Sequence, residues 1–204
     1  VAIPASASPL LTVGTILVLT GLVGTFGTEA LAGFGIGSRV EFLMIPLIFG
    51  IGTAMTSIVG ANIGANNIER AETVGIYGGS LAGIVSVFIG LTLALFPDLW
   101  IQYFTDDPKA SAVTTMYIQL VGPFYVFQGI GLSLYFASQG ANAMKWPTIA
   151  TIARFLIASI GGSIAIYWLG LGIESIFLSS SIAMMVFGLT IFISIKRGAW
   201  RKTS

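Results

Sequence analysis

Residues 59–72 read VGANIGANNIERAE and contain three asparagines, two glutamates and one arginine. Long apolar runs lie on both sides of this segment, over residues 35–59 and 73–96, and only Arg39 and Glu41 carry charge within them. The hydrocarbon core of a bilayer is about 30 Å thick and takes about 20 apolar residues per helix. A polar segment between two runs of this length is typical of a turn in water between two transmembrane helices. The segment therefore predicts an all-α integral membrane protein.

The composition of the whole chain indicates the same class. Of its 204 residues, 55% are hydrophobic and 8% are charged, whereas soluble domains carry about 25% charged residues. The mean hydropathy is +0.95. Nine Lys and Arg residues and a net charge of +1 exclude the basic surface that a nucleic-acid partner requires. The absence of cysteine and histidine excludes disulfides, zinc sites, and thiol or imidazole catalysis.

Six apolar runs are long enough to be counted as transmembrane helices. They cover residues 9–25, 35–59, 73–96, 112–137, 148–169 and 173–195. A transmembrane barrel would alternate apolar and polar residues, and these runs are apolar on all faces. The first run lacks a basic n-region and a small-residue cleavage site, so we expect a span and not a signal peptide. Residues 1–204 are thus expected to form a single six-transmembrane-helix bundle.

The distribution of charge predicts the orientation of the bundle. Lys and Arg near the ends of spans favour the cytoplasmic side. One set of ends carries Arg70, Lys145, Lys196, Arg197, Arg201 and Lys202, and the other carries Lys109 and Arg39 beside the acids Glu29, Asp98, Asp106, Asp107 and Glu174. We therefore expect both termini to be cytoplasmic, in a multi-pass protein of a bacterial plasma membrane. Trp100, Trp146, Trp168 and Trp200 fall at predicted span ends, as indoles in a headgroup interface do.

The opening segment then becomes a cytoplasmic turn between the second and third spans. We expect Gly64 to end the incoming helix in a left-handed conformation. Asn66 followed by Glu69 resembles a capping box for the outgoing helix. In this interpretation the asparagines and charges lie in the turn because water is there.

Glycines and prolines inside the spans predict where helices approach or bend. Gly75, Gly79 and Gly83 recur at four-residue spacing and give one helix face on which a neighbouring backbone can approach closely. Pro46 and Pro123 each remove a helical hydrogen bond and favour a kink. Kinked helices line the cavities of transporters but also occur in ordinary spans. Pro46 and Pro123 are therefore candidates for hinges or for simple kinks.

Two charged residues, Glu41 and Arg154, are expected about two turns inside the predicted spans. Glu41 is expected about two turns inside the second span, roughly 10 Å from its outer end. A charge at the centre of a span costs about 2.5 to 3.5 kcal/mol even on insertion scales, so Glu41 either faces a cavity and binds a proton or a cation, or pairs near the interface with Arg39 or Ser38. Arg154, two turns into the fifth span, is close enough to the cytoplasmic headgroups to extend its side chain to them.

Three segments resemble those of the multidrug and toxic compound extrusion (MATE) transporters. The first segment, VGANIGANNIERA at 59–71, is similar to the family's turn V-G-Q-N-x-G-A-G-x-x-x-R-A. The second, GFGIGSRVEFLMIP at 33–46, is similar to the Y-G-I-x-x-R-I-E stretch that enters the eighth helix of the family. The third, ASQGANAMKWP at 137–147, is similar to the L-Q-G-x-G-x-x-x-x-P turn after the tenth helix. The matching residues are Val59, Gly60, Asn62, Gly64, Ala65, Arg70 and Ala71, then Gly35, Ile36, Arg39 and Glu41, then Gln139, Gly140 and Pro147.

The resemblance implies that the six spans are the C-terminal half, or C-lobe, of a twelve-helix antiporter. Such a transporter exchanges H+ or Na+ for a cationic or amphipathic small molecule across a cavity between two lobes. It uses no cofactor beyond the coupling ion, and its partners are the bilayer, the substrate and a second six-helix lobe. The N-terminal lobe is absent from this chain. Either the sequence is a fragment, which a start at Val1 favours, or a half-size protein pairs with another lobe.

The resemblance also implies candidate site residues. Substrate or ion coupling is expected at Glu41, Gln128, Tyr125 and Arg39. Gln128 aligns with an aspartate of the sodium-coupled branch, which puts that sodium site in doubt, although an amide can still bind a substrate. Residues 1–27 also lack the acid that some members carry in the seventh helix. Tyr125 and Tyr135 offer aromatic faces for an organic cation.

Other classes of protein fit the sequence less well. An intramembrane enzyme lacks a catalytic set, because there is no His, no Cys and no pair of acids within one span. A flippase for lipid-linked oligosaccharides, in the same superfamily, needs arginines that face a pyrophosphate, and only Arg39 and Arg154 are available. A half protein that transports nothing and serves as an assembly module is the third possibility.

Overall fold

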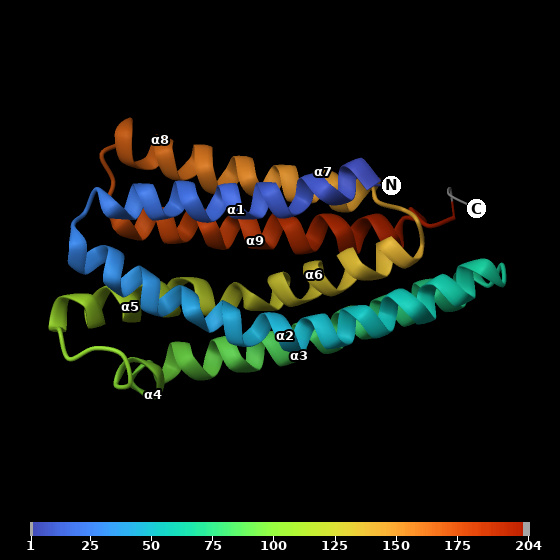
Figure 1. Ribbon diagram of the computed structural model, residues 1–204, viewed down its shortest axis with the longest axis horizontal. Helices are drawn as coiled ribbons and strands as arrows, with labels where there is room; N and C mark the ends of the chain where they lie inside the picture. Colours follow the sequence, from blue (N-terminus) through green and yellow to red (C-terminus); the bar gives the residue numbers. More distant parts are fainter. Residues whose placement is uncertain (1, 202–204) are drawn as a thin grey trace.

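The computed structural model describes residues 2–201, with side chains from Ser8 onward, and every regular element in this range is helical (Figure 1). The longer helices are α1 (Ala2–Gly24), α2 (Thr28–Gly64), α3 (Ile68–Leu95), α5 (Pro108–Val121), α6 (Tyr125–Gly140), α7 (Lys145–Leu156) and α9 (Ile173–Lys196). The short elements are α4 (Asp98–Ile101), η1 (Gly122–Phe124), η2 (Ile157–Gly161) and α8 (Gly162–Tyr167). The predicted all-α class is confirmed.

Each of the six predicted spans corresponds to one continuous helical segment, and three of them, 9–25, 73–96 and 148–169, extend one or two residues past its end. Over the described residues, five segments are long and apolar enough to cross a membrane, and the apolar part of α1, Ser8–Gly24, is shorter. Helices α5 and α6 join through η1 into one such segment, and α7 and α8 join through η2 into another. By helix length alone, the number of six transmembrane helices is therefore approximate. The assignment of residues 1–204 to one lobe stays a prediction.

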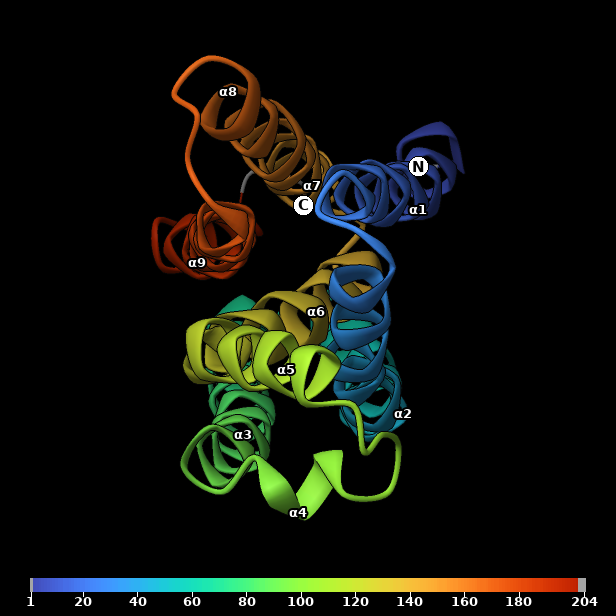
Figure 2. The ribbon, with the colours of Figure 1, turned by 90° about the vertical axis from the view of Figure 1, so that its left-hand side faces the viewer.

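The helices form two layers that run side by side. Figure 2 shows α1, α7, α8 and α9 in one layer and α2, α3, α5 and α6 in the other, with α4 at the edge of the second. Aromatic side chains from three helices meet between the layers, since the Tyr117 ring packs edge-on against Phe34 and Phe177 at centroid distances of 5.4 and 5.1 Å. The two layers therefore meet in a packed core, whose side chains are held in place by contacts from both layers.

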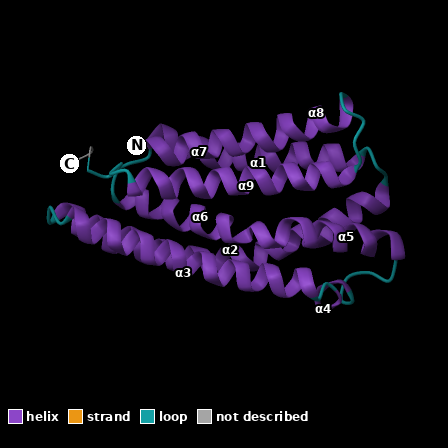
Figure 3. Ribbon diagram, turned by 180° about the vertical axis from the view of Figure 1, so that it is seen from behind, coloured by secondary structure: helices purple, strands orange, loops and turns teal. Residues whose placement is uncertain are grey.

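The chain ends and turns gather at the two ends of the bundle. Both termini lie at the same end as the α2–α3 and α6–α7 turns, while the α1–α2 turn, α4 and the α8–α9 loop lie at the other (Figures 1 and 3). The basic residues Arg70, Lys145, Lys196 and Arg197 thus share one end of the molecule. The grouping of charge expected from the sequence is present, and the assignment of this end to the cytoplasm stays a prediction.

The α2–α3 turn differs in detail from its prediction. Helix α2 ends at Gly64, but the left-handed residue is Asn66, with a φ of 57°. The side chain that caps α3 belongs to Asn67, whose Oδ1 accepts a hydrogen bond of 3.3 Å from the backbone N–H of Arg70. The expected roles of Gly64 and of the Asn66–Glu69 pair were wrong. The short polar side chain of asparagine tolerates the left-handed region, so a glycine is not required there.

The glycine face of α3 packs as the spacing predicted. A Cβ built on Gly79 or Gly83 would lie 3.0 Å from Leu134 or 2.7 Å from Ile130, both on α6. The aromatic ring of Trp200 lies against Gly75 in the same way. Small residues therefore set the close approach of α3 to α6 and to the C-terminal turn.

The two prolines have different surroundings. Pro123 lies in η1, where the chain tightens between α5 and α6, and its missing N–H removes one hydrogen bond of an α-helix at this point. Pro46 lies within α2, which is helical from Thr28 to Gly64. The proposed hinge roles of both prolines stay predictions.

Trp200 is an exception among the tryptophans. Its side chain is 1% exposed, and its indole N–H donates to Ser138 Oγ at 3.3 Å. The next residue, Arg201, donates to both carboxylate oxygens of Glu72 at 3.0 and 2.6 Å, which raises the pKa of Arg201. The C-terminal turn thus folds back onto α3 and α6. Trp200 thus follows the end of α9 as expected, but its indole is buried in the protein and does not face the surroundings, whereas Trp168 is 85% exposed.

Candidate functional site

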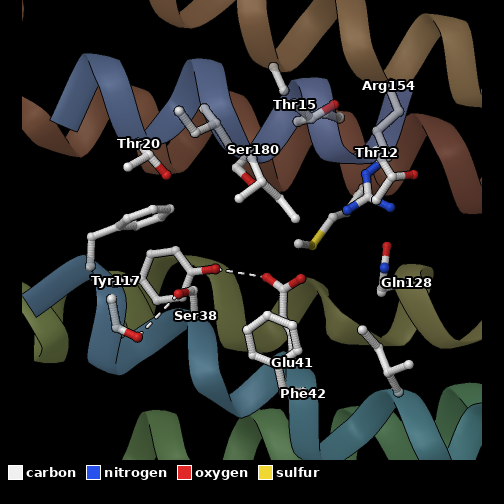
Figure 4. Close-up of a pocket in the computed structure, with 18 of the residues that line it drawn as sticks. Thr12, Thr15, Thr20, Ser38, Glu41, Phe42, Tyr117, Gln128, Arg154 and Ser180 are labelled. Atoms are coloured by element: carbon white, nitrogen blue, oxygen red, sulfur yellow. Dashed lines mark hydrogen bonds between the residues drawn. The ribbon is translucent and has the colours of Figure 1, made fainter. Parts of the chain in front are cut away.

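A cavity of about 330 Å³ lies between the two helix layers. Most of its wall is apolar, with Leu19, Phe34 and Met184 among the lining side chains. Its polar lining comes from six helices and includes Thr12, Thr15, Thr20, Ser38, Glu41, Tyr117, Gln128, Arg154 and Ser180 (Figure 4). The cavity therefore combines an oily surface with one acid, one base and several groups that form hydrogen bonds, as small-molecule sites do.

Glu41 lies in the interior of a long helix. Helix α2 begins at Thr28, seven residues before the predicted span, so Glu41 lies about 20 Å from the start of the helix at 1.5 Å per residue. Residues 28–34 are helical although they are less apolar than the run that follows, and the expected depth of Glu41 in the membrane stays a prediction. Ser38, Glu41 and Ile45 line the cavity from one face of α2, because residues three and four apart share a helix face.

The partner of Glu41 is a tyrosine on another helix. The Tyr117 hydroxyl of α5 donates to Glu41 Oε1 at 2.8 Å (Figure 4). Ser38 instead donates to the backbone oxygen of Gly35 at 3.2 Å. The interfacial pairing with Arg39 or Ser38 was therefore wrong, since Glu41 points across the helix interface and not along its own helix.

Sequence reasoning missed Tyr117, although a signal was present. Tyr117 precedes Gln128 by eleven residues, close to three helical turns, so a nearly continuous helix places both on one face. Thr114, three residues earlier, donates to the backbone oxygen of Gly33 at 3.0 Å and joins α5 to α2 beside this face. The row of polar residues on the fourth predicted span could have identified the wall of the cavity.

Gln128 lies in this wall as expected. Its side chain is 4% exposed, and its Oε1 has no hydrogen-bond partner among the described residues. Unpaired buried polar atoms are costly, and in a cavity they indicate a place for a ligand or water.

Arg154 also lines the cavity, which contradicts the expected extension to the headgroups. Its guanidinium lies 5.4 Å from the centroid of the Phe187 ring on α9, and Figure 4 shows it directed into the cavity. Arg154 is on the face of α7 that meets α1 and α9, so its side chain is enclosed by helices. Burial against an aromatic face replaces the contact with lipid headgroups.

Two expected site residues do not reach the cavity. The Tyr125 ring is 1% exposed and packs beside Gly90 on α3, so it offers no free aromatic face. Arg39 is exposed on the other side of α2, with its guanidinium 5.5 Å from the centroid of the Phe104 ring. Arg39 is turned away from Glu41 because it lies on the other side of α2. Tyr125 lies behind the cavity wall, where its hydroxyl interacts with Tyr117 and Glu41. The coupling roles of both residues stay predictions.

A second cavity of about 430 Å³ adjoins the first through shared lining residues. Thr12, Ile45, Gln128 and Arg154 belong to both. The second cavity adds aromatic walls from Phe49, Tyr135, Phe136 and Phe187, and the amide of Gln139. Tyr135 is thus placed where an aromatic face can meet a ligand, and Gln139 of the third family-like segment lies close to the site.

The other family-like residues are structural in this arrangement. A Cβ on Gly60 would lie 3.3 Å from the backbone oxygen of Gly140, so the two turns pack on each other. Asn62 Nδ2 donates to the Ile58 oxygen at 2.7 Å, and Gly64 and Arg70 are exposed in the turn. Within the described residues, no group of three or more acidic side chains could hold a metal ion.

A family model described as MatE matches residues 4–164. The chain belongs to the MatE family. It is 30% identical over 145 residues to the "Probable multidrug resistance protein NorM" of Thermotoga maritima, covering 71% of this chain and 31% of that protein. It is 25% identical over 191 residues to the "Probable multidrug resistance protein YpnP" of Bacillus subtilis, covering 91% of this chain and 43% of that protein. The chain thus spans less than half the length of these relatives.

Solved MATE structures share the fold. The structure of MATE in complex with MaL6 superposes with a TM-score of 0.88 at 24% identity, over 99% of this chain and 46% of that one. The bent form of VcmN from Vibrio cholerae superposes with a TM-score of 0.85 at 20% identity, over 97% of this chain and 45% of that one. The resemblance to one lobe of a MATE transporter is confirmed. The MatE chain is a multi-pass membrane protein, and its family consists of transporters and not of enzymes.

Proposed function

We propose that this MatE chain acts with a second six-helix lobe as an ion-coupled antiporter that exports cationic or amphipathic small molecules in exchange for H+ or Na+. The membership of the family and the coverage of less than half of each relative support a two-lobed transporter. The chemistry of the cavity supports the choice of coupling ion and of substrate class in this proposal.

The observation that carries the proposal is the carboxylate of Glu41 inside the bundle. A carboxylate at this depth is stabilised only by partners, by water in a cavity or by taking up a proton. The Tyr117 hydroxyl occupies one oxygen, and the other faces the cavity. Glu41 can therefore take up a proton or a cation and release it when the cavity opens to the other side. The apolar wall suits the hydrophobic part of an amphipathic substrate.

The flippase alternative has less support. It requires several arginines around an anionic pyrophosphate, but Arg39 lies outside the cavity and Glu41 would repel the anion. Arg154 alone remains for this role. The assembly-module alternative gives no account of an acid that lines a mostly apolar cavity inside the bundle.

Efflux from proteoliposomes tests the proposal. The complete transporter, containing this lobe and its partner lobe, should export a cationic dye under an imposed H+ or Na+ gradient. Glu41→Gln keeps the shape of the side chain but removes its charge, so we expect normal membrane abundance and a rate lowered about tenfold or more, which corresponds to at least about 1.4 kcal/mol. Glu41→Asp should be intermediate. The exposed acid Glu174 provides the control Glu174→Gln, which should transport normally.

Two outcomes would count against the proposal. Efflux that responds to neither gradient would exclude ion-coupled antiport. Normal rate and normal ion dependence in Glu41→Gln would move the coupling site to the other lobe.

A further inference from the structure

Opposite charges line the cavity without forming an ion pair. Among the described residues, the ion pairs within 4 Å are Lys109–Glu29 and Arg201–Glu72, both at the ends of the bundle. Glu41 and Arg154 interact electrostatically across the cavity but lie farther apart than this. The space between them is bordered by a negative group on α2 and a positive group on α7.

Arg154 is held in the cavity by packing and not by hydrogen bonds. Its guanidinium lies over the Phe187 ring, and none of the hydrogen bonds among the described residues involves its side chain. The π-helical turn Ile157–Gly161 begins three residues later. Such turns are uncommon and are frequent at functional sites. The donors of Arg154 are thus available to a ligand in the cavity.

A third group borders the same space. The amide of Gln128 points into it near Arg154, and its buried Oε1 is unpaired (Figure 4). A ligand that occupied this space would therefore meet a guanidinium and an amide at one end and a carboxylate at the other. Charged hydrogen bonds of this kind are stronger than neutral ones.

We infer that Arg154 determines the charge selectivity of transport, by acting as a tethered cation that competes with simple cationic substrates for Glu41 and by binding the acidic group of zwitterionic ones. This inference rests on the proposed function. A bare cation gains the attraction of Glu41 but is repelled by Arg154. A zwitterion satisfies both charges, with its ammonium or iminium group toward Glu41 and its carboxylate toward Arg154 and Gln128.

A matched pair of dyes tests this inference. A rhodamine methyl ester is a monocation, and the free acid of the same dye is a zwitterion at neutral pH. Binding and efflux of both dyes are measured with the complete transporter. Arg154→Gln should strengthen binding of the ester and weaken binding of the free acid. The ratio of the affinity for the acid to the affinity for the ester should then fall about tenfold, equivalent to about 1.4 kcal/mol. Arg154→Lys keeps the charge and should retain most of the selectivity.

The control removes a similar cation elsewhere. Lys196 Nζ lies 4.9 Å from the centroid of the Phe192 ring at the end of α9, outside both cavities. Lys196→Gln therefore loses one charge and one cation–aromatic contact and should leave the acid-to-ester ratio unchanged. If Arg154→Gln fails to fold, Glu41→Gln gives a reciprocal test. With Arg154 unopposed, affinity for the ester should fall more than affinity for the acid.

The outcomes separate this inference from the proposed function. If neither dye is bound or exported by the wild type, both proposals fail. If the dyes are exported but Arg154→Gln leaves their ratio unchanged, transport stands and the role of Arg154 in selectivity is refuted. A purely structural role of Arg154 would lower both affinities equally and leave the ratio as it was, which would also refute the inference.

Discussion

At the scale of single residues, the main feature is a half-buried carboxylate, that of Glu41, whose direct hydrogen-bond donor is a phenol. Tyr117 reaches Glu41 from another helix, and the ring of Tyr117 is fixed between Phe34 and Phe177. A donor held by aromatic packing keeps its direction when the charge of its acceptor changes. This arrangement orients Glu41 toward the cavity without neutralising it.

Tyr117→Phe tests this orientation. The ring contacts remain, so the fold should lose only about 1.5–3 kcal/mol, the range for a hydrogen bond to a charged group. Transport should slow by about tenfold because one oxygen of Glu41 loses its donor. Initial dye efflux and thermal unfolding in detergent measure the two effects. Tyr103→Phe is the control, since Tyr103 is 76% exposed, and wild-type transport by Tyr117→Phe would show that the hydroxyl is dispensable.

At the scale of helices, the closest contacts use small residues and exposed backbone. Near the end of the bundle that holds both termini, Gly140 of α6 lies against the backbone of Thr56 on α2. The Thr56 hydroxyl also donates to the backbone oxygen of Phe136 at 2.9 Å. These contacts connect α2, which carries Glu41, to α6, which carries Gln128. The family-like glycine is therefore part of the support of the site.

Two motif glycines give opposite predictions for the same substitution. In Gly140→Ala the new methyl group would overlap the backbone of Thr56, so we expect a loss of about 1–3 kcal/mol from overpacking. In Gly64→Ala nothing lies within 4 Å, and the residue is helical, so stability should be unchanged or should rise by up to about 1 kcal/mol. Thermal unfolding of the purified variants compares them, and equal effects would contradict the close packing of α2 and α6.

At the scale of the whole molecule, charge and topology agree. The termini and the turns after α2 and α6 lie at one end of the bundle, and this end carries the larger group of basic residues (Figure 1). Six crossings would bring both termini to one side of the membrane, and the excess of Lys and Arg predicts that this side faces the cytoplasm.

Cysteine labelling tests this topology, because the chain contains no cysteine. We expect Glu69→Cys, in the first turn of α3, to react only from the cytoplasm, and Asp106→Cys, before α5, only from outside. Glu69 is preferable to Asn66, whose left-handed φ would strain a cysteine. A membrane-impermeant maleimide applied to sealed cells distinguishes the sides. Labelling of both positions from the same side would overturn the predicted orientation.

The sequence predicted much of the fold and part of the site. Hydropathy located six helical segments. Glu41 and Gln128, two of the predicted coupling residues, line the cavity, and their role in coupling stays a prediction. The helix start at Thr28 was missed, because the first turns of α2 are less apolar than its centre. Tyr117 was missed because a tyrosine in an apolar span has no sequence pattern that identifies its partner.

By itself, the sequence determined that this chain is a bundle of membrane helices with its basic residues at one end. Transfer from water to lipid acts on each segment separately, so these properties follow from composition along the chain. Only the tertiary structure decided that Arg154 enters the cavity, that Arg39 and Tyr125 do not, and that Trp200 is buried. These outcomes depend on how far each helix is rotated and on which distant helix packs against it, and hydropathy is nearly the same for every rotation of a helix that is apolar on all sides.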